Sequence, residues 1–143
     1  MTARLLRRLS LWLLVPVLGT AGALVVATPS QAATTCTADY LVVSHWNATP
    51  TTAAGWQGQF TVTNTGTTAT TTWRTGFHLI NGASITGYWN AKAVSIFLRT
   101  YYSNAVFNGT LAPGQSTTWG FMARSALLLP DAHNALDVTC VAA

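Results

Sequence analysis

Three large aromatic side chains stand where burial in a protein core is hard to arrange. Trp46 opens a polar loop, Trp89 ends a strand-like run against small and polar residues, and Phe107 directly precedes an Asn-Gly turn. Exposed rings on a neutral, hydroxyl-rich surface suit the apolar face of a sugar, whose axial C–H bonds can stack on an aromatic ring. Partial burial of one ring contributes on the order of 1–3 kcal/mol before association costs. A row of such rings is therefore predicted to bind a sugar polymer.

The spacing of strands also suits a sugar polymer. Two strand spacings are about 10 Å, which is close to the length of one cellobiose repeat. Rings placed on neighbouring strands of one sheet could therefore contact successive sugars of a single chain.

Three other tryptophans are in phase with apolar neighbours and are predicted to fill a core. Trp56 lies in the run WQGQFTVTNTG (56–66), Trp73 in TWRTGFHL (72–79) and Trp119 in STTWGFMA (116–123). Each run alternates apolar and polar residues, which is typical of strands with one buried face. The run ALDVTC (135–140) is expected to place Leu136 and Cys140 on one face together with Val138. No helical period is evident, and turn-forming clusters of Gly, Asn and Thr separate the runs.

These short alternating runs predict an all-β fold. The expected architecture is an antiparallel β-sandwich, immunoglobulin-like or jelly-roll-like. Cys36 and Cys140 stand at the two ends of the domain and predict one disulfide that joins the terminal strands. A metal pair is the alternative, but two cysteines without nearby histidines fall short of a ligand set.

The first 32 residues have the pattern of a secretory signal peptide. A basic start that includes Arg7 and Arg8 precedes a long apolar stretch, and small residues surround a cleavage site after Ala32. We therefore expect a secreted protein whose single domain spans 33–143, with no membrane contact after removal of the signal. A retained membrane anchor is the alternative, since the apolar stretch approaches spanning length.

Charge and composition exclude several function classes. Residues 33–143 carry four Lys and Arg against three Asp, which leaves a net charge of +1 and no basic patch for nucleic acid. Glycoside hydrolysis needs two carboxylates about 5–10 Å apart, and Asp39, Asp131 and Asp137 are scattered. The three histidines are too dispersed to predict a metal site. We expect a monomer without catalytic activity, cofactor or metal.

Several segments together resemble carbohydrate-binding module family 2, the bacterial cellulose-, chitin- and xylan-binding modules of secreted hydrolases. These segments are the terminal cysteines, TVTNTG, ITGYWNA, FNGTLAPG and TTWGF, and the resemblance extends from Cys36 to Cys140. It implies a β-sandwich whose flat aromatic face adsorbs to insoluble β-1,4-linked polysaccharide: cellulose, chitin or xylan.

The resemblance also implies which residues form the flat face. Trp46 and Trp89 match two of its tryptophans, and Phe107 stands where the family has a third. Strict alternation does not place Trp89 outward, because Ile85 shares its parity; the resemblance places it outward with Tyr88 packed beneath or beside it. The predicted site therefore contains six residues: Trp46, Trp89, Phe107, Tyr88, Asn47 and Asn90.

One residue bears on the choice of polymer. Xylan-binding members have an arginine that turns the tryptophan out of the plane, and the matching position here is Gly55, which resembles the cellulose and chitin type. The competing hypothesis is a small secreted β-sandwich that uses its exposed aromatics for a protein interface, as a structural or inhibitory protein.

Overall fold

A computed structural model describes residues 32–47, 49, 54–80, 82–125 and 134–143, all of which belong to one compact unit. The predicted signal peptide lies outside these residues except for Ala32, so its cleavage and the start of the domain at residue 33 stay predictions. The described part of the chain contains eight strands: β1 (Cys36–Trp46), β2 (Gly55–Asn64), β3 (Trp73–Leu79), β4 (Ser84–Trp89), β5 (Ala91–Ile96), β6 (Arg99–Asn104), β7 (Ser116–Arg124) and β8 (Ala135–Ala142).

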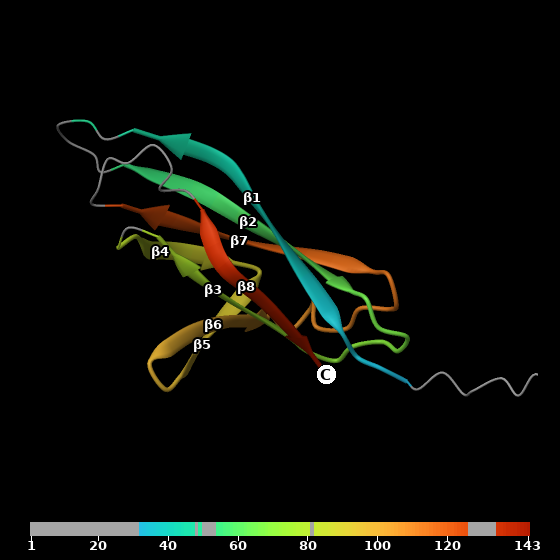
Figure 1. Ribbon diagram of the computed structural model, residues 1–143. Coiled ribbons are helices and arrows are strands. Elements are labelled where there is room, and N and C mark those ends of the chain that lie inside the picture. Colours follow the sequence, from blue (N-terminus) through green and yellow to red (C-terminus); the bar gives the residue numbers. More distant parts are fainter. Residues whose placement is uncertain (1–31, 48, 50–53, 81, 126–133) are drawn as a thin grey trace, which may run out of the picture. The chain divides into compact units, whose positions relative to one another are not determined.

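The strands form two four-stranded antiparallel sheets, which confirms the predicted antiparallel β-sandwich. The first sheet has the order β1-β2-β7-β4 and the second the order β5-β6-β3-β8. Strands β1, β2 and β7 run side by side across the molecule, and the β5–β6 hairpin projects from the other sheet (Figure 1). No helix in the described residues is long and apolar enough to span a membrane.

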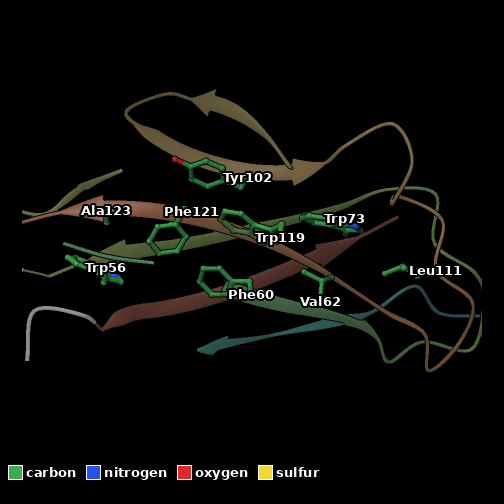
Figure 2. Close-up of a cluster of buried hydrophobic side chains, with 9 residues drawn as sticks. All are labelled: Trp56, Phe60, Val62, Trp73, Tyr102, Leu111, Trp119, Phe121 and Ala123. Atoms are coloured by element: carbon green, nitrogen blue, oxygen red, sulfur yellow. The ribbon is translucent and has the colours of Figure 1, made fainter. Parts of the chain in front are cut away.

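The core lies between the inner faces of the two sheets and is rich in aromatic rings. Phe60 of β2 lies 4.8 Å from Phe77 of β3, and Trp119 of β7 stacks on Tyr102 of β6 at 4.7 Å between ring centroids. These contacts join the sheets, and Figure 2 shows the rings gathered between the strands. The prediction that Trp56, Trp73 and Trp119 fill the core is confirmed, because all three are buried.

The predicted disulfide is also confirmed. Cys36 begins β1 and Cys140 lies near the end of β8, and their sulfur atoms are bonded. Because β1 and β8 are edge strands of different sheets, this bond closes the sandwich along one side.

One predicted inward residue faces the other way. The pairing of β3 with β8 shifts between Gly76 and His78, where β8 contains one extra residue. Asp137 occupies this bulge with a φ of 52°, and beyond it Leu136 pairs with His78 on the outer face and is exposed. The predicted inward position of Leu136 is therefore wrong, since a β-bulge reverses the alternation that follows it.

Candidate functional site

Trp46 and Trp89 lie on the same outer face, that of the sheet β1-β2-β7-β4. Trp46 pairs with Gly55 at the end of β1, and Trp89 pairs with Gly120 at the end of β4. Residues paired across a ladder share a face. Gly55 and Gly120 lie next to the core residues Trp56 and Phe121 in their strands, so both glycines have outward positions. We call this surface, which holds Trp46 and Trp89, the flat face.

Both tryptophans reach the flat face through a β-bulge. The register of β1 shifts at Val43, and the register of β4 shifts at Thr86. Without these bulges each tryptophan would have the parity of an inward-facing residue, Val42 in β1 and Ile85 in β4. One extra residue in a strand moves all later side chains to the opposite face. Each edge strand therefore presents its terminal tryptophan outward.

Each tryptophan ring lies over the glycine with which it pairs. A Cβ atom added to Gly55 would collide with the Trp46 ring, and one added to Gly120 would collide with the Trp89 ring. The two glycines thus let the rings lie against the sheet instead of standing away from it. Trp89 nevertheless keeps 37% of its surface exposed, so the ring is supported on one side and open to solvent on the other.

The residues between the two tryptophans are mostly uncharged. Gln57 and Gln59 of β2 and Met122 of β7 occupy outward positions on the central strands. Gly55 on β2 and Gly120 on β7 are four residues apart along the strands and one strand spacing apart across them. The distance between the two glycines, over which the tryptophan rings lie, is therefore about 14 Å. Three consecutive sugars of a β-1,4-linked chain have a similar length.

Phe107 lies in the loop that joins β6 to β7, with 75% of its surface exposed. Its neighbour Asn108 is buried and holds the loop in place. The Asn108 side-chain amide donates a hydrogen bond to the carbonyl of Asn90 (2.8 Å), and the Asn108 carbonyl accepts one from Trp73 Nε1 (2.7 Å). Phe107 is thereby attached beside the end of β4, next to the residue that follows Trp89.

Tyr88 does not share the flat face. It pairs with Phe121, whose side chain is in the core, and its ring meets the Tyr102 ring edge-on at 5.3 Å. Because β4 is an edge strand, 46% of Tyr88 remains exposed. Burial raises the pKa of Tyr102, and Tyr88 adds a smaller contribution, so the Tyr102 phenol stays protonated at neutral pH.

The two predicted asparagines lie directly after the tryptophans. Asn47 is exposed just beyond the end of β1. Asn90 is exposed between β4 and β5 with a φ of 58°, a conformation that asparagine tolerates better than most residues. Its carbonyl is occupied by Asn108, which leaves its side chain as the group available at the surface.

The described charged residues are not arranged as a catalytic or metal centre. Asp39 is outward on β1 and Asp137 lies in the bulge of β8, on the other sheet. Within the described ranges, no group of three or more His, Cys, Asp or Glu side chains is placed to hold a metal ion. Asp131 and His133 lie outside the described residues.

The glycines beneath the rings were not identified from the sequence as a pair. The family resemblance points to Gly55, and the sequence-based prediction contains no role for Gly120. A glycine inside an alternating strand indicates a close approach by another group. That signal is present in TTWGF, which contains Gly120. Gly55 stands at the first position of its strand, and the glycine inside WQGQF is Gly58.

Comparisons with known proteins show the family to which the chain belongs. The family model of the cellulose binding domain, CBM_2, matches residues 36–139. Chitinase 63 of Streptomyces plicatus is 37% identical over 101 residues, which are 71% of this chain and 16% of the chitinase, so the chain spans less than a fifth of that relative. A cellulose/chitin binding protein of Mycobacterium tuberculosis is 34% identical over 107 residues, 71% of each chain. The solution structure of the chitin-binding domain of Chi18aC from Streptomyces coelicolor superposes with a TM-score of 0.55 at 28% identity, over 73% of this chain and 89% of that one.

Proposed function

Because the chain belongs to the cellulose binding domain family, family 2 of the carbohydrate-binding modules, we propose that it adsorbs to insoluble cellulose or chitin through the flat face. The observation that carries this proposal is the placement of Trp46 and Trp89 on one outer face, each over a glycine. Rings held against a sheet offer broad surfaces at one level, which matches the surface of a packed polymer better than a cleft would. Phe107 extends this aromatic surface beside the end of β4, with Asn47 and Asn90 as flanking hydrogen-bonding groups.

Gly55 favours cellulose and chitin over xylan. A larger residue at this position would collide with Trp46 and lift its ring from the sheet. With glycine there, Trp46 keeps the flat orientation that a layered polymer surface requires. The related proteins include a chitinase and a cellulose/chitin binding protein, and both polymers therefore belong in the first binding assay.

The proposed activity is binding without catalysis, by a protein that acts outside the cell. Asp39 and Asp137 are on different sheets and do not form the carboxylate pair of a glycoside hydrolase. Secretion is supported by the signal-like start of the sequence and by the disulfide, since such bonds persist in oxidising compartments.

Replacing Trp89 with alanine tests the flat face. The variant should lose about 1–3 kcal/mol of affinity for cellulose or chitin, roughly 5- to 150-fold, because one stacking ring is removed. Its melting temperature should change little, since the ring lies outside the core. Depletion of protein from solution by suspended polymer, over a range of protein concentrations, measures the affinity.

Phe97→Ala is the matched control for Trp89→Ala. Phe97 is 100% exposed but lies in the β5–β6 turn of the other sheet. Its loss should leave adsorption unchanged if the flat face binds the polymer. Equal losses in both variants would indicate nonspecific adsorption by exposed rings. A wild-type protein that stays in the supernatant with both polymers would favour the protein-interface hypothesis instead.

Replacing Gly120 with alanine tests whether the orientation of the ring matters, as distinct from its presence. The new methyl group would displace the Trp89 ring from the sheet, and we expect adsorption to weaken although every aromatic residue remains. Gly87→Ala is the control, because Gly87 has an outward position on β4 and a Cβ atom there would meet nothing within 4 Å. Equal adsorption by the two variants, in the same depletion assay, would contradict the requirement for a flat ring.

A further inference from the structure

A groove of about 630 Å³ opens in the second sheet, away from the flat face. Strands β3 and β6 pair at only two positions, Arg74 with Ser103 and Thr75 with Tyr102, whereas β5 and β6 pair along their whole length. The β5–β6 hairpin therefore leaves β3 and leads away from the body of the domain (Figure 1). The space between them is lined by residues of β3, β6 and β8, and also by Ala83 and Ile85 at the start of β4.

One wall of the groove repeats the construction of the flat face. Tyr101 of β6 lies over Gly76 of β3, where an added Cβ atom would stand 2.9 Å from two atoms of the ring. Arg74, which does not line the groove, places its guanidinium carbon 5.1 Å from the centre of the same ring. An aromatic ring supported by a glycine and held by a cation is a fixed platform, and here it borders a concave site.

Both hydrogen-bond donors and hydrogen-bond acceptors line the groove near the Tyr101 ring. His78 Nδ1 lies 3.6 Å from Asp137 Oδ2, and both side chains remain largely open to solvent. Arg99 on the opposite side of the groove supplies donors, and Thr139 supplies a hydroxyl. The formal charges of Arg99 and Asp137 in the lining are opposite, which favours an uncharged ligand rich in hydroxyl groups.

We propose that this groove is a second saccharide site, which binds a single soluble oligosaccharide chain. The volume falls within the range typical of small-molecule sites. Tyr101 stacks on one sugar ring, and Asp137 and Arg99 bond to its hydroxyls. The flat face is built from rings held against a sheet and suits a packed surface, so the two sites take different physical forms of saccharide. The groove does not depend on Trp46 or Trp89, and each site can fail without the other.

Amide chemical shifts of the isotope-labelled, disulfide-bonded protein locate the second site. Cellohexaose and chitohexaose, titrated separately to millimolar concentration, should shift the amides of Gly76, Thr100 and Thr139 in the wild type. The same shifts should occur in Trp89→Ala, which lacks part of the flat face. Absence of shifts with both saccharides, or shifts confined to β1, β2, β4 and β7, would overturn the proposal.

Two substitutions test the assigned polar groups. Arg99→Ala and Asp137→Asn should each weaken binding of the soluble saccharide about tenfold, as expected for loss of a hydrogen bond to a charged group. Asparagine also tolerates the positive φ of Asp137, so the bulge is retained. Lys92→Ala, on the same sheet but outside the groove, is the control and should bind normally. Unchanged affinity in both test variants would overturn the assignment, and adsorption to insoluble polymer should be unaltered in all three.

Discussion

Replacing Trp73 with alanine is expected to destabilise the folded domain by about 3–5 kcal/mol, as other large-to-small substitutions of buried aromatic residues do. Only 1% of the Trp73 surface is exposed, and the ring is part of the cluster in Figure 2. The substitution would also leave the buried carbonyl of Asn108 without the hydrogen bond from Trp73 Nε1. Urea unfolding followed by circular dichroism measures the loss.

The control for Trp73→Ala is a substitution in the neighbouring loop. Val106 is an exposed apolar residue between β6 and β7, and Val106→Ala should change the free energy of unfolding by only a few tenths of a kcal/mol. An unfolding midpoint of Trp73→Ala equal to that of the wild type would show that the ring does not fill the core. Trp73→Ala should lose polymer adsorption only under conditions where it unfolds, whereas Trp89→Ala should lose adsorption while folded.

Removing the disulfide should have a comparable effect on stability. The double variant Cys36→Ala, Cys140→Ala is expected to lose about 2–5 kcal/mol, chiefly because an unlinked chain has more freedom when unfolded. The bond also joins the edge strands of two different sheets, so its loss frees one side of the sandwich. Denaturant titration of the variant and of the oxidised wild type measures the difference.

The state of the cysteines in the wild type supplies the control for the double variant. Thiol labelling of the unfolded, non-reduced protein should find no free cysteine, since the described chain contains none. Two labelled cysteines in a protein with full stability would show that the bond is not needed. A double variant that unfolds at the wild-type denaturant concentration would lead to the same conclusion.

Most of the core could be predicted from the sequence because alternation of apolar residues is a direct consequence of strand geometry. Trp56, Phe60 and Val62 are separated by four and by two positions along β2, a central strand without a bulge, and all three are buried. The disulfide could be predicted from the cysteine positions alone. In both cases one local pattern was sufficient.

The prediction failed or was incomplete where a bulge changes the alternation. Leu136 was assigned to the core but is exposed, because the extra residue at Asp137 reverses its direction. Strict alternation predicts the same face for Trp89 and Ile85, which are four residues apart. Trp89 faces outward and Ile85 inward only because the extra residue Thr86 lies between them. A bulge adds one residue without a distinctive residue type, so periodicity alone does not locate it.

The groove beside Tyr101 was not predicted, because it arises from the divergence of two strands that are far apart in the sequence. The residues of β3 and β6 give no sign that their pairing ends after Thr75. The exposed turn of Phe97 and Leu98 is a visible signal in retrospect, since two large apolar residues rarely form the tip of a hairpin. This turn indicates that the β5–β6 hairpin projects from the domain, but it does not indicate the groove between β3 and β6.

The order of strands in the second sheet has a consequence for the sequence in which the two sheets can be completed. Strand β3 lies between β6 and β8, both of which are synthesised after it, and β8 is the last strand. Until β8 is available, one edge of β3 has no strand to pair with, whereas the β1–β2 ladder can already form. Pairing of distant strands is slow because a long loop must close first. The second sheet is thus completed only after β8 is available. Formation of the Cys36–Cys140 disulfide, in which an external oxidant accepts the two electrons of the thiols, then fixes a sandwich whose strands are already assembled.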